Sequence, residues 1–423
     1  MKRILTAVII GGGCRGQIYS NLMKQMTDRY RVTAVAEPLE ERRRCIQNQH
    51  GIPDENCFED WRDLLKGKRK ADVAVIATMD RQHYEPVMEA IRLHYDILLE
   101  KPVSPFPDEC LRIAEYAEQE KVKILVCHVL RYAPFFTVIK KLITDGRLGR
   151  IISVNHEECV GNIHQSHSFV RGNWGNTERS SCMLLQKSCH DLDILQWLIG
   201  KKCRKVQSFG SLSYFTPGNR PEGAPEYCMD GCPRGDSCPY NAEKLYLKDR
   251  ENTWFREMCT GTVRPSDEEV ERALRTTQYG KCVFACDNDA VDHQTVSMLF
   301  EDDITVTFTM CAFNKGGRNI HIMGTKGELT GSMDSINPIL LYDFETGMTE
   351  KIPFTGKDGI VNGHGGGDRN ILISLYDLLA AGNGGPSVTD IRTSVSSHLL
   401  AFAAEESRKT GKIIDFEEYI SSL

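Results

Sequence analysis

The first apolar run of the chain leads directly into a glycine-rich turn, and residues 4–16 read ILTAVIIGGGCRG. In this G-x-G-x-x-G pattern, Gly11 permits a tight turn, Gly13 lets the backbone approach a pyrophosphate, and Gly16 lets a helix pack closely on the strand. The residues that follow have the apolar spacing of a helix, whose N-terminus would face the anion. The stretch therefore predicts a strand–turn–helix unit that binds a dinucleotide. The residues predicted to bind it here are Gly11, Gly13, Cys14, Arg15 and Gly16.

A carboxylate follows the second apolar run, where the dinucleotide ribose would lie. The run from Tyr30 to Ala36 ends at Glu37, about twenty residues beyond the glycine turn, as the pattern expects. A carboxylate there favours a free ribose diol and repels a 2′-phosphate, so NAD is the predicted cofactor. Three arginines follow at 42–44, which leaves NADP open.

Length, net charge and cysteine usage limit the classes of protein to which this chain could belong. A chain of 423 residues is long enough for two domains. The net charge of −6 gives no reason to expect nucleic acid or an anionic membrane as partner. We expect no spanning helix and no signal peptide. Most of the 16 cysteines stand singly in apolar runs, which favours a reducing compartment and predicts a cytoplasmic location.

The pattern of apolar runs changes along the chain. Over 1–127, strands that end near Ile10, Ala36, Thr78, Leu99 and Cys127 alternate with helical segments, which predicts a parallel sheet in a Rossmann domain. Over 128–423, closely spaced strands predict an α+β domain with a large, open, mainly antiparallel sheet. The polar segment at about 214–290 is interpreted as an insertion. The helices expected to cover one face of the second sheet lie around 181–199, 367–381 and 393–410.

Two segments carry candidate catalytic residues. The sequence Glu100-Lys101-Pro102 follows a predicted parallel strand, at the edge where such sheets bind ligands. A lysine there can bind a substrate hydroxyl and lower its pKa; the alternative is a surface salt bridge. His190 follows Lys187 by three residues on one predicted helix, so the two side chains would share a face. A histidine can accept a proton near neutral pH, although a structural histidine is the alternative.

Together these residues resemble the Gfo/Idh/MocA family of nicotinamide-dependent sugar oxidoreductases, over essentially the full length. The most specific feature is Glu100-Lys101-Pro102, and the glycine turn and the His190 helix agree with it. The resemblance implies that Lys101 and His190 flank the substrate carbon that exchanges hydride with nicotinamide. It also implies a homo-oligomer, dimer or tetramer, formed through the open sheet. The further residues that it assigns are Thr78, His83 and Glu100 at the cofactor and Arg131, Tyr132 and Lys187 at the substrate.

The sequence departs from this family at one position. Many members carry an aspartate four residues before the histidine, whereas this chain has Gln186, which cannot take a proton. Lys187 and Asp191 are the nearby groups that could act in its place. The departure leaves an altered reaction open.

Two further segments could reach a sugar. The glycines around His364 and Asp368 could bring both side chains to the substrate, or Asp368 could simply begin a helix. Trp174 offers a ring for a sugar face, or it anchors a loop. The predicted ligand is accordingly a sugar, polyol or glycoside.

A cysteine group within the insertion has metal-ligand character. Cys228, Cys232 and Cys238 lie within eleven residues, and Cys282 is the predicted fourth thiol. Four thiolates can bind zinc tetrahedrally or hold an iron–sulfur cluster, and the spacing does not distinguish the two. Free thiols are the alternative. A metal here would be structural.

The leading hypothesis is an NAD-dependent oxidoreductase that acts on a secondary hydroxyl of a sugar, polyol or glycoside. A redox-neutral, NAD-dependent glycosidase that works through a transient keto-sugar is the first alternative. A non-catalytic nucleotide-binding regulatory protein is the second, and intact Lys101 and His190 argue against it.

Overall fold

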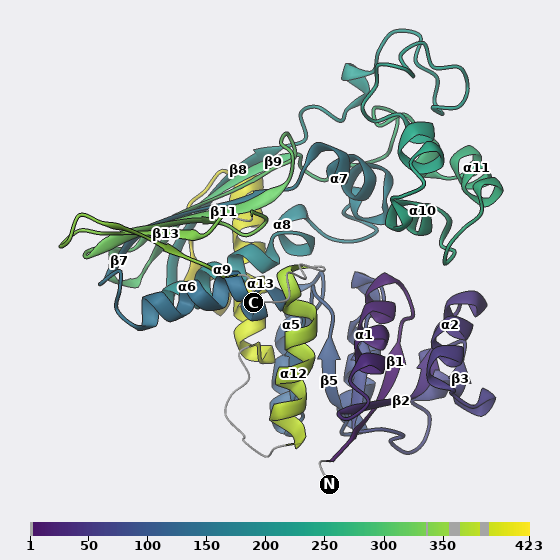
Figure 1. Cartoon of the computed structure of the whole chain (residues 1–423), viewed down its shortest axis with the longest axis horizontal. Coiled ribbons are helices and arrows are strands. Elements are labelled where there is room, and N and C mark those ends of the chain that lie inside the picture. The colour runs from purple at the N-terminus through teal and green to yellow at the C-terminus, as the bar shows by residue number, and fades with distance from the viewer. Residues whose placement is uncertain (1–2, 336, 355–363, 381–388) are drawn as a thin grey trace.

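The computed structural model describes residues 3–335, 337–354, 364–380 and 389–423. Its N-terminal part is a six-stranded parallel sheet in the order β3-β2-β1-β4-β5-β6, which confirms the predicted Rossmann architecture (Figure 1). The strands are β1 Leu5–Ile10, β2 Tyr30–Ala36, β3 Cys57–Phe58, β4 Val73–Ile76, β5 Asp96–Leu99 and β6 Ile124–Val126. The helices are α1 Cys14–Gln25, α2 Glu40–His50, α3 Trp61–Leu64, α4 Tyr84–Arg92 and α5 Pro107–Gln119.

The second sheet has nine strands in the order β14-β13-β12-β11-β7-β10-β9-β8-β15. Its pairs are antiparallel except that β7 and β10 run parallel, as predicted for a mainly antiparallel sheet. The strands are β7 Ile151–Cys159, β8 Cys203–Ser211, β9 His293–Phe300, β10 Thr305–Cys311, β11 Gly317–Gly324, β12 Gly327–Ser332, β13 Ile339–Asp343, β14 Thr349–Ile352 and β15 Ile414–Asp415. The helices of this part, apart from the insertion, are α6 Pro134–Thr144, α7 Asn162–Ser166, α8 Met183–Gln186, α9 Cys189–Ile199, α13 Ile391–Thr410 and α14 Phe416–Ser421.

Helix α12, Gly367–Ala380, lies on the first sheet and not on the second, contrary to the sequence-based expectation. Its buried residues Leu372 and Leu375 join a core with Leu5 and Ile9 of β1, and the Tyr30 hydroxyl donates to the Leu372 carbonyl at 2.5 Å. The apolar spacing indicated a helix with a buried face, but spacing alone cannot specify which sheet that face covers. The consequence is that α12 brings the residues at its N-terminus to the edge of the dinucleotide domain.

The helix expected over 181–199 is two helices. α8 ends at Gln186 and α9 begins at Cys189, with Lys187 and Ser188 between them. The prediction that Lys187 and His190 share one helix face is therefore wrong, since the break changes the direction of the backbone between them. As a result, the two side chains have different neighbours: Lys187 pairs with Glu158, and the His190 ring lies beside that of His364.

The insertion is ordered and contains two helices, α10 Thr253–Thr260 and α11 Asp267–Thr276. A capping box between Ser266 and Glu269 begins α11 and provides partners for two backbone N–H groups at the start of the helix. The insertion overhangs α1 and α2 in Figure 1. Two hydrogen bonds join it to α2: Arg42 Nε donates to the Gly261 carbonyl at 2.8 Å, and the Val263 N–H donates to Glu41 Oε1 at 3.0 Å.

Among the helices of the described residues, none has both the length and the apolar character needed to cross a membrane.

Candidate functional site

The glycine turn lies at the carboxyl end of β1 with almost no room for side chains. A Cβ on Gly11, whose φ is +90°, would come within 2.6 Å of the Ala77 carbonyl oxygen, and one on Gly16 within 2.0 Å of the Gly11 carbonyl oxygen. Among the described residues, no side chain caps the first turn of α1, so its N–H groups remain suited to an anion. The turn is built as the sequence predicted.

Glu37 closes this turn from the end of β2. Its carboxylate is 5% exposed and accepts hydrogen bonds from the Gly12 N–H at 2.6 Å and the Leu39 N–H at 3.0 Å. The carboxylate is thus fixed beside the backbone that would approach the pyrophosphate. Contact of this carboxylate with the adenosine ribose stays a prediction.

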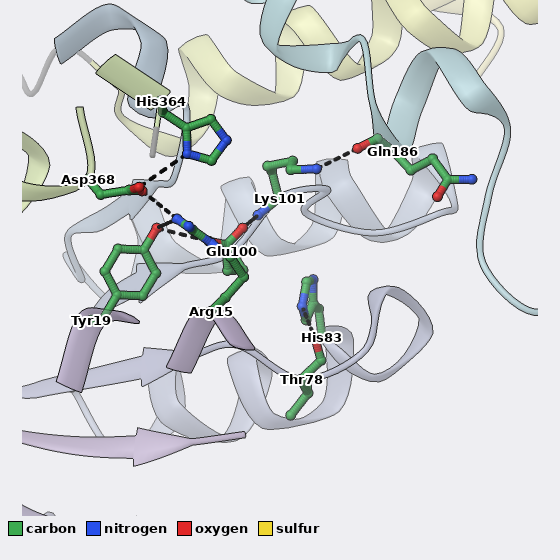
Figure 2. Close-up of polar contacts among 9 residues, drawn as sticks. All are labelled: Arg15, Tyr19, Thr78, His83, Glu100, Lys101, Gln186, His364 and Asp368. Atoms are coloured by element: carbon green, nitrogen blue, oxygen red, sulfur yellow. Dashed lines mark hydrogen bonds and ion pairs between the residues drawn. The ribbon is translucent and has the colours of Figure 1, made fainter. Parts of the chain in front are cut away.

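Arg15 links three elements below the turn, as Figure 2 shows. Its Nε donates to Glu100 Oε1 at 2.6 Å, and its Nη2 donates to Asp368 Oδ1 and to the Tyr19 hydroxyl, each at 2.5 Å. Burial alone would raise the pKa of the Asp368 carboxyl, but bonding to His364 and the charge of Arg15 hold it at about 2. Arg15 therefore ties α1 to the Glu100 turn and to the start of α12.

His83 fixes the turn that carries the candidate lysine. Its ring is 1% exposed and lies between the Pro102 carbonyl, 2.7 Å from Nδ1, and the Thr78 carbonyl, 3.1 Å from Nε2. The loop after β4 is thereby held against the turn after β5. These contacts make His83 a positioning residue for Lys101, and direct contact of Thr78 and His83 with a cofactor stays a prediction.

Lys101 points toward the second part of the chain. Its Nζ donates to the Gln186 main-chain carbonyl at 2.5 Å (Figure 2). The Gln186 side chain turns away, and its Nε2 donates to the Trp174 and Ser181 carbonyls at 3.0 and 2.9 Å. Gln186 thus contacts Lys101 through its main chain, while its side chain secures the loop that carries Trp174.

His190 is buried in α9 among other histidines. Its ring lies 5.5 Å from the ring of His364 and 5.8 Å from that of His128. Within the described residues its Nδ1 has no hydrogen-bond partner. Burial, followed by the positive charge of Lys101, lowers the pKa of His190 well below its ordinary value. The imidazole is therefore neutral at neutral pH and able to accept a proton.

His364 and Asp368 come to the same place from the start of α12. His364 Nδ1 lies 3.2 Å from Asp368 Oδ2, and its pKa is lowered, mainly by burial. Residues 362 and 363 of the predicted glycine loop lie outside the described residues. Asp368 lies in the first turn of α12 and pairs with Arg15, and contact of His364 or Asp368 with a substrate stays a prediction.

Lys187 belongs to a buried network of charged side chains. Its Nζ lies 3.2 Å from Glu158 Oε1, and Arg318 pairs with the other Glu158 oxygen at 2.5 Å and with Asp191 at 2.9 Å. His156 Nε2 lies 2.8 Å from the same Asp191 oxygen. Burial lowers the pKa of Lys187, and the Glu158 charge opposes that effect. Lys187 and Asp191 therefore bind within this network, while His190 Nδ1, which either could have polarised, has no partner among the described residues.

Sequence reasoning missed Arg318 and Asp80. Arg318 shares the inward face of β11 with Ile320 and Ile322, and that alternation is a signal that could have located it. Asp80 follows β4 and is 7% exposed; burial raises the pKa of its carboxyl, although His83 and Lys101 oppose the effect. Its Oδ2 has no partner among the described residues.

Arg131 and Tyr132 have structural partners. Arg131 is 3% exposed and forms a bidentate pair with Asp193, with both N–O distances 2.6 Å. The Tyr132 hydroxyl lies 2.9 Å from Thr389 Oγ1. These contacts support α9 and α13 beneath the site, and contact with a substrate stays a prediction for both residues.

The predicted metal ligands surround a cavity of about 20 Å³ in the insertion. All four thiols, Cys228, Cys232, Cys238 and Cys282, line it. As placed, however, they do not meet at one point: in the described part of the chain, no three Cys, His, Asp or Glu side chains are grouped as ligands of one ion. Binding of a metal by these four thiols stays a prediction.

Comparison with known proteins agrees with this geometry. Residues 5–128 match the family described as "Oxidoreductase family, NAD-binding Rossmann fold", and residues 140–416 match "Oxidoreductase family, C-terminal alpha/beta domain". The Bacillus subtilis protein YteT is 24% identical over 353 residues, 77% of this chain and 79% of that protein. Inositol 2-dehydrogenase of Corynebacterium glutamicum and 2,7-anhydro-N-acetylneuraminate hydratase of Escherichia coli are each 24% identical. They cover 49% and 50% of this chain and 58% and 54% of their own lengths.

Solved structures share the whole fold. A levoglucosan dehydrogenase in complex with NADH and levoglucosan superimposes with a TM-score of 0.73 at 16% identity, covering 98% of this chain and 100% of that one. Together, the two family matches extend from Leu5 to Phe416. This chain belongs to the Gfo/Idh/MocA family of NAD-binding oxidoreductases.

Proposed function

We propose that the protein oxidises or reduces a secondary hydroxyl of a sugar, polyol or glycoside with NAD, using Lys101 and His190. The observation that carries this proposal is that the Lys101 ammonium reaches across to the Gln186 carbonyl, just before helix α9, which carries the buried His190 ring. Lys101 lies at the carboxyl end of β5, the edge at which parallel sheets bind ligands. The inositol dehydrogenase and levoglucosan dehydrogenase relatives support this class of substrate.

In alcohol oxidation, Lys101 and His190 would have different roles. Bound NAD would accept the hydride from the carbon. The Lys101 ammonium would hold the hydroxyl oxygen and stabilise the charge that develops on it. The His190 imidazole, which burial keeps unprotonated by lowering its pKa, would take the hydroxyl proton. Reduction of a ketone would reverse these transfers.

We further infer that NAD is preferred to NADP. Glu37 is fixed beside the turn, and each of the three nearby arginines has a partner. Arg42 binds the Gly261 carbonyl, Arg43 binds the Glu37 carbonyl, and Arg44 pairs with Glu40. A 2′-phosphate would meet a carboxylate and would have to compete for those arginines.

Screening sugars, inositols and glycosides for NAD reduction by the purified protein tests the proposal. A substrate should be consumed with formation of one NADH for each ketone formed. Failure of every polyol and sugar to reduce NAD, together with tight NAD binding, would favour the regulatory alternative instead.

A redox-neutral reaction is the second candidate. Its support is Gln186 at the family's aspartate position and the hydratase relative, together with the buried Asp80 carboxyl after β4. Such an enzyme would oxidise a sugar transiently, eliminate or add a group, and reduce the sugar again. Release of free sugar from a glycoside without NADH accumulation would identify this reaction.

We also infer a cytoplasmic homo-oligomer. The second sheet exposes apolar side chains on strands, notably Phe209, Leu340 and Tyr342, with Phe209 62% exposed. A second copy packed on that face would bury them. Sedimentation of the purified chain should give twice or four times the mass of one chain.

A further inference from the structure

Four of the cysteines in the insertion, Cys228, Cys232, Cys238 and Cys282, lie in two short backbone units. Cys228 and Cys282 each follow a residue of the antiparallel bridge between Tyr227 and Lys281, so they lie diagonally across it. In that bridge the Cys228 N–H donates to the Gly280 carbonyl at 2.9 Å, and the Cys282 N–H donates to the Glu226 carbonyl at 2.8 Å. The backbone thus holds these two cysteines on adjacent segments of the chain.

The second unit is the tight loop from Cys232 to Cys238. The Gly235 N–H donates to the Cys232 carbonyl at 3.0 Å, and the Cys238 N–H donates to the Arg234 carbonyl at 2.8 Å. Both thiols of the loop line the cavity that the bridge also lines. Two pairs of thiols therefore approach one space from two rigid units, an arrangement suited to a tetrahedral metal.

Arg171 provides an independent indication. Its guanidinium lines the same cavity and is 2% exposed. It donates to the Lys281 and Tyr240 carbonyls at 2.9 and 2.7 Å and contacts Cys228 Sγ at 3.6 Å, while Nη1 has no partner. Within the described residues no carboxylate pairs with it. A buried cation without an anion is costly, and thiolates around the cavity would supply the missing negative charge.

We propose that Cys228, Cys232, Cys238 and Cys282 bind a metal centre as thiolates, with Arg171 as its counter-charge. The thiols as placed do not meet, so binding requires each to turn about its Cα–Cβ bond into the shared cavity. With Zn²⁺, four thiols release four protons and form four metal–sulfur bonds, which leaves a net charge of −2. An iron–sulfur cluster would use the same four thiolates.

The centre is structural, because all four ligands come from the protein and leave no position for substrate. Arg171 belongs to the same segment as Trp174, and His167 of that segment stacks on Phe255 of α10 at 4.0 Å. A metal would therefore fasten the insertion to the segment that carries Trp174. The inference is independent of the proposed reaction, since metal content can be measured without a substrate.

Elemental and acid-labile sulfide analysis of the anaerobically purified full-length chain tests the proposal. One equivalent of zinc without sulfide, or iron with an equal amount of sulfide, supports a thiolate centre and tells the two kinds apart. Titration of Co²⁺ into chelator-treated protein should give the sulfur-to-cobalt absorption of tetrathiolate coordination. Less than a tenth of an equivalent of either metal, with no cobalt spectrum, would overturn the proposal.

Matched variants locate the centre. Cys232→Ser should lower bound metal at least tenfold, whereas Cys286→Ser should retain it, because the Cys286 thiol donates to the Cys282 carbonyl at 3.4 Å and does not line the cavity. NAD binding and circular dichroism show whether each variant is folded. Where Cys232→Ser does not fold, loss of the cobalt spectrum on thiol-specific alkylation of the native chain replaces it. Equal metal in both folded variants would assign the metal elsewhere and contradict the proposal.

Discussion

Lys101 is held by the main chain of Gln186 and not by its side chain. The Nζ–carbonyl distance is 2.5 Å, while the Gln186 amide nitrogen binds the Trp174 and Ser181 carbonyls. The family's aspartate position is therefore used here to secure a loop. Lys101 keeps its direction because a main-chain acceptor does not depend on which side chain occupies the position.

Truncation of Gln186 should affect substrate binding more than turnover. Gln186→Ala removes the hydrogen bonds that hold the Trp174 loop, at a cost of about 1 kcal/mol each. We expect KM to rise roughly fivefold or more and kcat to change less than twofold. Gln196→Ala, on α9, is the control. A hundredfold fall in kcat with KM unchanged would mean that the Gln186 side chain acts in the chemistry.

Lys101 and His190 should be required for turnover and dispensable for NAD binding. Lys101→Ala removes charge stabilisation made mostly in the transition state, and His190→Asn removes the base. Each should lower kcat by roughly a hundredfold or more. NAD affinity, measured by calorimetry, should stay within a few-fold because neither change touches the glycine turn. Near-full activity of either folded variant would refute its assigned role.

The pH profile should distinguish the neutral His190 from an ordinary histidine. Its pKa is lowered well below the usual value, chiefly by burial and then by Lys101. A base works when unprotonated, so the rate of alcohol oxidation should be independent of His190 titration through neutral pH and should fall only in the acid range. A rate that rises steeply between pH 6 and 7, and loses that step in His190→Asn, would show that the pKa is not lowered.

Glu37 should set cofactor choice. Glu37→Ala removes a buried carboxylate beside the turn, and loss of charge-assisted hydrogen bonds should weaken NAD binding roughly tenfold. NADP binding should weaken less or improve, since the repulsion disappears. Glu55→Ala, at an exposed position before β3, is the matched control. If wild-type protein binds NADP as tightly as NAD, the preference is wrong and Arg42 or Arg43 accepts the phosphate.

The sequence predicted the glycine turn, Lys101 and His190 because their signals are local: a pattern of six residues, a charged pair at a strand end, and a family resemblance. The charge network was less predictable. Glu158, Arg318 and Asp191 come from β7, β11 and α9, and only the register of the second sheet brings them together. The position of α12 was wrong for the same reason, since a helical period identifies a buried face but not the surface that receives it.

Buried histidines should make the fold acid-sensitive in a defined range. Burial lowers the pKa values of His398 and His167 to about 3. His398 accepts the Val103 N–H at 2.9 Å through Nε2 and lies 2.7 Å from the Ser394 carbonyl through Nδ1, so a neutral ring satisfies both contacts. The unfolded chain takes up a proton near pH 6.5, whereas the folded chain resists it until about pH 3. Stability is therefore complete above pH 6.5 and falls with decreasing pH, by about 1.4 kcal/mol per pH unit for each such histidine.

Urea unfolding between pH 7.5 and pH 4.5 measures this loss. Asp368 and Asp191, whose pKa values are about 2, lose their contribution only below about pH 4, so they do not contribute to the upper part of the range. His398→Gln keeps a donor and an acceptor, and it should reduce the slope of unfolding free energy against pH by about 1.4 kcal/mol per pH unit, the contribution of one histidine. His94→Asn, at an exposed position, should leave this slope unchanged. A free energy of unfolding that is constant from pH 7.5 to pH 5 would mean that these histidines titrate normally in the folded chain.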